Sequence, residues 1–182
     1  MVCVTRHSIL TVDSHRDLLL HHVAPIGLAA ARPTALLVDL DGAAPMYPGR
    51  MTIADLLTDG VRQSDLVPRR PGTAVLGRGD AGLGDAIEMV STLSSGWPAI
   101  VVRSGIESLP YPRIEVVPAF PAEWGSALDK IVVQRTVGGK PPAKLSLPPL
   151  RPAQVRSMLD GKVSRRWRWV RAWGPAWEMP WD

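Results

Sequence analysis

The segment Thr34–Leu40, which reads TALLVDL, constrains the fold more than any other part of the sequence. Its apolar residues are nearly continuous and do not alternate with polar ones. A strand with that pattern is typically buried on both faces, as in a parallel sheet covered by helices. Other short β-rich runs alternate with helical patterns along the chain. The sequence therefore predicts an α/β fold, with a mainly parallel sheet and flanking helices.

The remaining elements follow from local patterns. Pro25 and Gly27 interrupt the first helical pattern, and Gly60 follows the end of the second. Strands are predicted at Val2–Thr5, Thr73–Leu76, Ala99–Arg103, Ile114–Val117 and Ile131–Gln134, and helices at Asp17–Ala31, Thr52–Thr58 and Gly84–Leu93.

Proline usage divides the chain of 182 residues into three parts. Five prolines fall between Gly138 and Pro152, a density that excludes a regular helix or a central strand. We therefore predict one α/β domain over residues 1–137, a proline-rich connector over residues 138–152, and a basic, tryptophan-rich C-terminal tail over residues 153–182.

The net charge of +4 comes from the C-terminal end of the chain. Residues 151–182 contain seven Lys and Arg and three Asp and Glu, whereas the other 150 residues contain fourteen of each kind. Cys3 is the only cysteine, so no disulfide framework and no thiolate metal cluster is expected. The sequence shows neither a secretory leader nor an apolar run of about 18 residues. We expect a soluble, cytoplasmic protein.

Two carboxylates, Asp39 and Asp41, lie at the carboxyl end of the predicted buried strand. Ligands of open α/β sheets bind at that edge. Side chains two residues apart point to the same side of a strand, so the pair could share a divalent cation or divide nucleophile and acid roles. The structural alternative is that both carboxylates accept backbone hydrogen bonds and cap the following turn.

The string Asp39-Leu40-Asp41-Gly42 resembles the DxDG signature of the haloacid dehalogenase phosphatases, with Ala43 in place of their Thr. Gly79-Asp80 to Asp85 resembles their later metal-binding motif. The resemblance implies a metal-dependent phosphatase that uses Asp39 and Asp41 catalytically, with Asp80 and Asp85 as further metal ligands. Only about forty residues separate the two strings, which leaves little room for the phosphatase core.

A second resemblance, to the MinD/ParA-like deviant Walker ATPases, covers roughly residues 1–105 and depends on the order of several short motifs. A helix that ends at Ala29–Pro33 is followed by LLVDLDG, and Thr52–Leu57 is similar to the family's LxDLL helix. Arg70–Gly77 resembles the GLxVLPG segment, and Trp97–Arg103 stands where a YDxVIVD strand is expected. The resemblance implies the family's α/β fold and places Asp39 and Asp41 at the family's metal-proximal positions.

The phosphate loop of that family is absent from the sequence. The corresponding stretch, Thr5–Arg16, contains neither Gly nor Lys, although backbone N–H groups and an ammonium are what cradle phosphates in such loops. Arg103 also replaces the Asp expected at the end of its strand. The resemblance therefore implies a nucleotide-independent relative, a pseudo-ATPase that holds no cofactor.

The four histidines do not form a recognisable metal motif. His15 and His22 are seven residues apart and could share a helix face, but no carboxylate completes a spacing such as HExxH. We interpret all four histidines, His7, His15, His21 and His22, as surface or capping residues.

The tail reads SRRWRWVRAWGPAWEMPWD from Ser164 to Asp182, and Trp169, Trp173, Trp177 and Trp181 recur every four residues. Pro175 and Pro180 limit a helix to the part before about Gly174. The tryptophans could cover the domain or a partner protein. Interleaved Arg and Trp could also lie at an anionic membrane surface, or bind nucleic acid.

The leading hypothesis is a non-catalytic MinD/ParA-like protein that acts through protein–protein contacts, with the tail as its docking element. A homo-oligomer is compatible with it. The alternatives are the phosphatase, and nucleic-acid or anionic-membrane binding through the tail. The predicted partner-binding residues are Arg165, Arg166, Trp167, Arg168, Trp169, Arg171, Trp173, Trp177 and Trp181.

Overall fold

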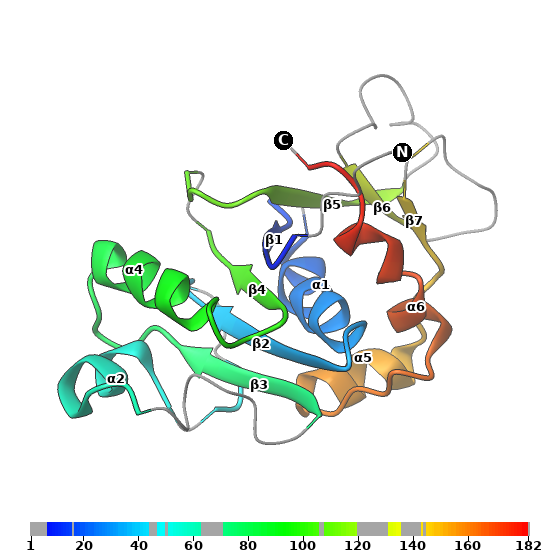
Figure 1. Cartoon of the computed structure of the whole chain (residues 1–182). Coiled ribbons are helices and arrows are strands. Elements are labelled where there is room, and N and C mark those ends of the chain that lie inside the picture. Colours follow the sequence, from blue (N-terminus) through cyan, green and yellow to red (C-terminus); the bar gives the residue numbers. More distant parts are fainter. Residues whose placement is uncertain are drawn as a thin grey trace.

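A seven-stranded, all-parallel sheet forms the centre of the protein (Figure 1), in the strand order β3-β2-β4-β1-β5-β6-β7. The computed structural model describes residues 7–15, 17–43, 47–49, 51–62, 71–105, 108–119, 131–135, 143 and 145–181. The strands are β1 (Ile9–Asp13), β2 (Thr34–Asp39), β3 (Gly72–Gly77), β4 (Ile100–Arg103), β5 (Arg113–Ala119), β6 (Ile131–Arg135) and β7 (Leu145–Leu147). The predicted α/β class with a parallel sheet is confirmed.

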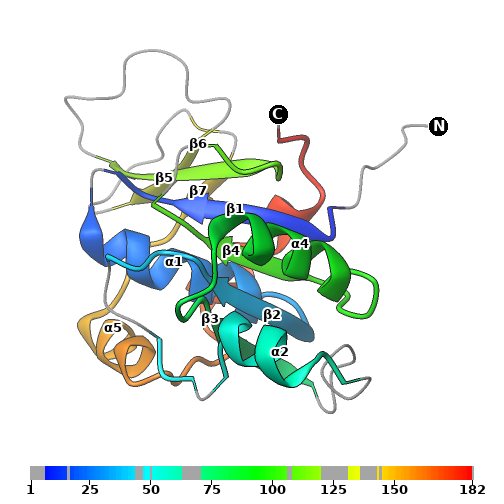
Figure 2. The ribbon, with the colours of Figure 1, turned by 90° about the vertical axis from the view of Figure 1, so that its left-hand side faces the viewer.

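Helices cover both faces of this sheet (Figures 1 and 2). They are α1 (Leu18–Ala30), α2 (Ile53–Asp59), α4 (Leu83–Leu93), α5 (Pro152–Leu159), α6 (Arg168–Arg171) and the 3-10 helix η3 (Gly174–Trp177). On one face lie α1 and the C-terminal elements α5, α6 and η3, and on the other lie α2 and α4. None of the helices that the structure describes has both the length and the apolar character needed to traverse a lipid bilayer.

Short polar signals fix where α1 and α2 begin. Asp17 caps α1, because its carboxylate accepts the Leu20 N–H at 2.9 Å. Thr52 and Asp55 form a reciprocal capping box at the start of α2. Gly60, with a φ of 78°, ends α2 in a conformation that favours glycine.

The first strand that the structure describes was not among the predicted ones. Ile9–Asp13 forms β1, in the middle of the stretch that we aligned with a phosphate loop. The predicted strand Val2–Thr5, like Cys3, lies outside the described residues. The other predicted strands and helices lie within the observed ones or overlap most of their length.

Strand β2 separates two apolar cores. Leu37 packs in the core beneath α1, whereas Leu36 and Val38 pack in the core beneath α2 and α4. Successive side chains of a strand point to opposite faces. A continuous apolar run therefore supplies both cores at once, which is why TALLVDL predicts a strand covered on both sides.

The C-terminal tryptophans complete the first core. Trp169, Trp173 and Trp177 are at most 1% exposed, and Trp181 is 5% exposed. Their side chains pack with those of α1, so residues from the predicted tail belong to the same core as the predicted domain. Of the three interpretations of the tail, the structure describes the one in which the tryptophans cover their own domain.

Helix α1 continues through both residues that we predicted to interrupt it. A Cβ atom at Gly27 would lie 2.1 Å from Cζ3 of Trp169 and 2.7 Å from Nε1 of Trp173. Glycine at this position therefore lets the tail approach the α1 backbone closely. Pro25 lies inside the same helix without ending it.

The described part of the proline-rich range contains regular structure. Leu145–Leu147 forms β7 at the edge of the sheet, paired with β6. Pro152 is the first residue of α5, a position at which its missing N–H costs nothing. The carbonyl of Pro148 accepts a hydrogen bond from the buried Gln134 side chain at 2.9 Å.

Candidate functional site at the carboxyl edge of the sheet

A pocket of about 620 Å³ lies where β1, β2 and β4 end. The carboxyl ends of parallel strands are where α/β proteins bind their ligands. Residues from the strand ends, from the first turns of α1 and from α5 line it: Ser14, His15, Leu18, Leu19, His21, His22, Asp41, Ala43, Arg103, Gly105 and Leu159.

A buried ion pair between Arg103 and Asp39 lies beneath this pocket. Arg103 Nε donates to Asp39 Oδ1 at 2.8 Å, and Nη2 donates to Oδ2 at 2.6 Å. The Arg103 side chain is 0% exposed and that of Asp39 is 5% exposed. A bidentate pair of this kind holds both side chains in one geometry. Asp39 is therefore engaged as the counter-ion of Arg103.

Two aromatic rings complete the surroundings of Arg103. Its Nη1 donates to His22 Nδ1 at 3.1 Å, and its guanidinium lies 4.3 Å from the centroid of the Tyr47 ring. The Tyr47 hydroxyl donates to the His22 carbonyl at 2.6 Å, and burial raises the pKa of that hydroxyl, so Tyr47 stays neutral. The guanidinium is thus enclosed by a carboxylate, an imidazole and a ring face.

The second predicted carboxylate, Asp41, binds His21. His21 Nε2 donates to Asp41 Oδ2 at 2.7 Å, and the Ala43 N–H donates to Oδ1 at 2.9 Å. Burial opposes ionisation of Asp41, but the hydrogen bonds from the Ala43 N–H and from His21, together with the charges of His21 and Arg103, hold the pKa of its carboxyl below the ordinary value. Asp41 is therefore an ionised carboxylate at neutral pH.

The His21–Asp41 pair does not extend into a nucleophile triad. The backbone N–H of Ser14 approaches His21 Nδ1 at 3.4 Å, so this ring nitrogen faces a donor. A general base would instead direct that nitrogen at the hydroxyl it deprotonates. The geometry favours a structural or ligand-binding role for the pair.

The turn between β1 and α1 is too short to encircle a phosphate. Only residues 14–17 separate the two elements, and Asp17 directs its carboxylate at the N–H groups of the first helical turn. An anionic side chain thus occupies the end of the helix that would otherwise attract a phosphate. Among the described residues between β1 and α1, the N-terminus of α1 is therefore capped by the Asp17 carboxylate.

The structure does not bring the four predicted metal-binding carboxylates together. Asp80 and Asp85 are exposed, and Asp85 lies in the first turn of α4 on the opposite face of the sheet from α1. Among the described residues, no group of three or more His, Cys, Asp or Glu side chains is arranged to hold a metal ion. The phosphatase alternative therefore gains no support at Asp39, Asp41 or the predicted metal site.

Each of the four histidines has its own hydrogen-bond partner. His7 Nε2 donates to the Met179 carbonyl at 3.0 Å, which ties the start of the described chain to its end. His15 accepts from Arg113, which also donates to Asp13 at 2.6 Å. His21 and His22 are buried, so the prediction of surface or capping positions is wrong for these two.

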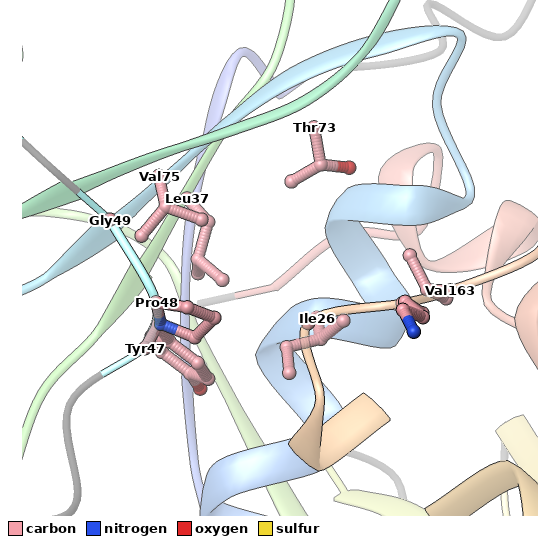
Figure 3. Close-up of a pocket in the computed structure, with 10 residues that line it drawn as sticks. Ile26, Leu37, Tyr47, Pro48, Gly49, Thr73, Val75 and Val163 are labelled. Atoms are coloured by element: carbon pink, nitrogen blue, oxygen red, sulfur yellow. The ribbon is translucent and has the colours of Figure 1, made fainter. Parts of the chain in front are cut away.

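A second pocket, of about 510 Å³, lies between α1, the edge strand β3 and the turn after α5. Figure 3 shows Leu37, Val75 and Pro48 on one side and Val163 on the other. Gly161, with a φ of 71°, forms that turn, and a Cβ there would lie 2.8 Å from Pro48. The residues that line this second pocket are mainly apolar, and none of the predicted site residues is among them.

The predicted partner-binding residues divide into two sets. Trp169, Trp173, Trp177 and Trp181 are buried in the first core, and Trp167 is half-buried. The four arginines, Arg165, Arg166, Arg168 and Arg171, are exposed. Three of the four, all except Arg168, line a small cavity of about 380 Å³ together with Ala30 and Ala31 at the end of α1.

Sequence reasoning missed the residues that enclose Arg103. His22 and Tyr47 carry no motif of their own, and in the sequence Arg103 stands out only as a departure from a family pattern. One signal was available: an arginine in an otherwise apolar strand end needs a buried partner, and Asp39 is the carboxylate at the end of another predicted strand. No protein-family model, no curated protein and no solved structure matches this chain.

Proposed function

We propose that this protein is a non-catalytic, MinD/ParA-like α/β protein that works in the cytoplasm by binding a protein partner. The observation that carries the proposal is the Arg103–Asp39 pair, closed by His22 and Tyr47, at the edge where a nucleotide's phosphates would lie. The compact turn capped by Asp17 supports it. In the Arg103–Asp39 pair and in the Asp17 cap, the charged groups and the helix N-terminus at this edge are bonded within the protein and do not face a nucleotide.

Nucleotide binding tests the proposal that the protein is a non-catalytic pseudo-ATPase. The purified full chain is titrated with ATP and Mg²⁺ by calorimetry, and phosphate release is followed over hours, with a P-loop ATPase measured in parallel. We expect neither saturable binding nor hydrolysis above the buffer rate. Saturable ATP binding with magnesium-dependent hydrolysis would refute the pseudo-ATPase assignment.

Phosphatase activity is tested in the same preparation with a generic phosphomonoester. The buried ion pair removes Asp39 from the set of available nucleophiles, so we expect no turnover. Robust activity that disappears in Asp39→Asn, with the variant still folded by circular dichroism, would favour the enzyme instead.

The docking surface that we propose is the arginine face of the tail. Arg165, Arg166, Arg168 and Arg171 project from a segment whose tryptophans are fixed in the core. The packed tryptophans fix the backbone that carries these arginines, and guanidinium groups form bidentate contacts with carboxylates. A partner with an acidic surface therefore fits this face, and the buried tryptophans act as its scaffold.

Matched charge reversals test this surface. Arg165→Glu/Arg171→Glu alters the arginine face, and Arg156→Glu/Lys162→Glu makes the same charge change at exposed residues outside it. Proteins cross-linked to each variant in cell extract are quantified against the wild type. We expect an acidic partner to be lost only from the first variant; equal losses from both, or no loss, would contradict the proposal.

The exposed arginines also favour a second candidate, the binding of nucleic acid or an anionic membrane through phosphate contacts. Because the four regularly spaced tryptophans are buried, such binding would be electrostatic and should fall steeply with salt. Binding to DNA or to anionic liposomes is measured across ionic strength. A large salt-resistant component would require inserted tryptophans and contradict the packing described above.

A further inference from the structure

A cavity of about 380 Å³ lies between the tail and the C-terminal end of α1. Three of the four exposed arginines of the tail line it, two from the turn before α6 and one from the end of α6. A concave surface with several side chains of one charge attracts ligands of the opposite charge. The residues of this arginine cavity are Ala30, Ala31, Arg165, Arg166, Val170 and Arg171.

The side chains that line the arginine cavity offer hydrogen-bond donors and no acceptors. Alanine and valine side chains are apolar, and a guanidinium carries five N–H donors without an acceptor. Within the described part of the chain, the side chains of Arg165, Arg166 and Arg171 form neither a hydrogen bond nor an ion pair. Their donors are therefore available to an anionic ligand.

The three arginines do not act as C-caps of α1. Basic side chains near the end of a helix often bond its last carbonyls. Here the Leu28 carbonyl accepts from the Trp177 indole at 3.2 Å, and the Ala29 carbonyl accepts from the Arg32 N–H at 3.1 Å. Capping of α1 therefore does not explain why three arginines line one cavity.

The floor of the arginine cavity belongs to the first core. Val170 is 0% exposed and Ala30 is 2% exposed. Next to Val170, the Trp169 indole donates to Gln134 Oε1 at 2.6 Å, which holds α6 in place. The backbone from which the arginines extend is thus fixed in the absence of a ligand, and this lowers the entropic cost of binding one.

We propose that the arginine cavity binds a phosphomonoester group, carried by a phosphorylated side chain of the protein partner. A phosphorylated side chain has a charge of about −1.5 to −2 at neutral pH and three acceptor oxygens. It therefore matches three guanidiniums better than a carboxylate or a phosphodiester, each of which carries a single charge. The inference rests on the proposed docking of a protein at the arginine face and specifies what that protein carries.

The size of the site favours a protein over a nucleic acid or a membrane. Those two surfaces present many phosphodiesters over a wide area, whereas a single cavity of this volume accommodates one phosphate group. Recognition of a phosphorylated side chain by clustered arginines needs only that one group.

Three small probes test the head-group requirement. Phosphoserine with blocked termini, glutamate with blocked termini and dimethyl phosphate are titrated into the full-length protein at neutral pH and constant ionic strength, followed by nuclear magnetic resonance of the backbone amides. We expect saturable shifts around the arginine cavity for phosphoserine, and binding of either monoanion that is weaker by at least about tenfold. Equal or tighter binding of a monoanion, or no saturable binding of phosphoserine, overturns the proposal.

Arg168 provides the matched control, because it is exposed on the same segment but does not line the cavity. Arg166→Gln and Arg171→Gln should each weaken phosphoserine binding about five- to tenfold, between the effects of losing an exposed ion pair and a charge-assisted hydrogen bond. Arg168→Gln should weaken it less than about twofold, because solvent and salt screen a more distant charge. Since all three side chains are exposed, the variants should keep the wild-type fold. Equal weakening in Arg168→Gln would indicate diffuse attraction of anions and refute the site.

Dephosphorylation separates this inference from the proposed function. The cross-linking experiment with Arg165→Glu/Arg171→Glu is repeated in cell extract treated with a phosphatase. We expect the partner that the charge reversal removes to be lost from the wild type as well. A partner that survives dephosphorylation but is lost on charge reversal overturns the phosphomonoester and leaves the docking surface standing. Phosphoserine binding with no partner lost on charge reversal refutes the docking surface, and with it the phosphorylated protein.

Discussion

Replacing Gly27 by alanine tests how tightly the C-terminal segment packs on α1. Within a helix this change normally stabilises by roughly 0.5–1 kcal/mol, because glycine loses more backbone entropy on folding. Here the new methyl group would lie 2.1 Å from Cζ3 and 2.5 Å from Cη2 of Trp169. We therefore expect Gly27→Ala to destabilise the protein.

The size of the effect follows from the geometry. Carbon atoms in contact lie about 3.5–4.0 Å apart, so the buried indole must move by more than an ångström within a packed core. Overpacking of this kind costs about 1–3 kcal/mol and occasionally more. With the backbone gain of roughly 0.5–1 kcal/mol subtracted, the free energy of unfolding should fall by up to about 2.5 kcal/mol.

Urea denaturation followed by far-ultraviolet circular dichroism measures this difference. Gly84→Ala is the matched control, because Gly84 lies inside α4 with nothing within 4 Å of its added Cβ; this variant should be stabilised by roughly 0.5–1 kcal/mol. Trp169→Leu should relieve the clash, so Gly27→Ala should cost less in that background. If Gly27→Ala stabilised the protein as much as Gly84→Ala does, the tail could not be packed on α1 as described.

Three further outcomes are expected. Arg103→Met leaves Asp39 as a buried, uncompensated charge and should lower the free energy of unfolding by about 3–5 kcal/mol in urea denaturation; a loss below about 1 kcal/mol would mean that the pair is not buried. Thr52→Ala removes the N-cap of α2 and should cost about 1 kcal/mol, whereas no measurable cost would argue against the capping box. The folded-state pKa of Asp41 is depressed, so its contribution to stability is present above the unfolded value of about 3.9 and is lost as pH falls through the lower folded value. When the free energy of unfolding is measured against pH, its decrease below about pH 4 should therefore be smaller for Asp41→Asn than for the wild type. Identical pH dependence in the two proteins would refute a depressed pKa of Asp41.

Local signals were sufficient to predict most of the sheet and helices. The strand β2 is recognisable because an uninterrupted apolar run suits only a strand with two covered faces. Helix α2 is recognisable from Thr52 at its start and Gly60 after its end, because both act within one turn of the helix. These features depend on neighbours only a few residues away.

The features that sequence reasoning missed depend on distant contacts. Arg103 and Asp39 are 64 residues apart, and neither residue alone indicates the other's role. From the sequence alone, Gly27 predicts an interruption of α1. Its role becomes clear only from Trp169 and Trp173, which lie against it in the structure. Strand β1 (Ile9–Asp13) was also missed, and its place in the sheet follows from pairing with β4 and β5, which are distant in the sequence.

The bond between the Trp177 indole and the Leu28 carbonyl joins residues 149 positions apart. Ribosomes add about 5–20 residues per second, so roughly 7–30 seconds pass between the synthesis of α1 and that of the side chain that covers it. During this interval the apolar face of α1 has no permanent cover. A nascent chain with this topology is therefore a natural client for chaperones that bind exposed apolar helices, and a stalled ribosome would leave a fragment unable to close its first core.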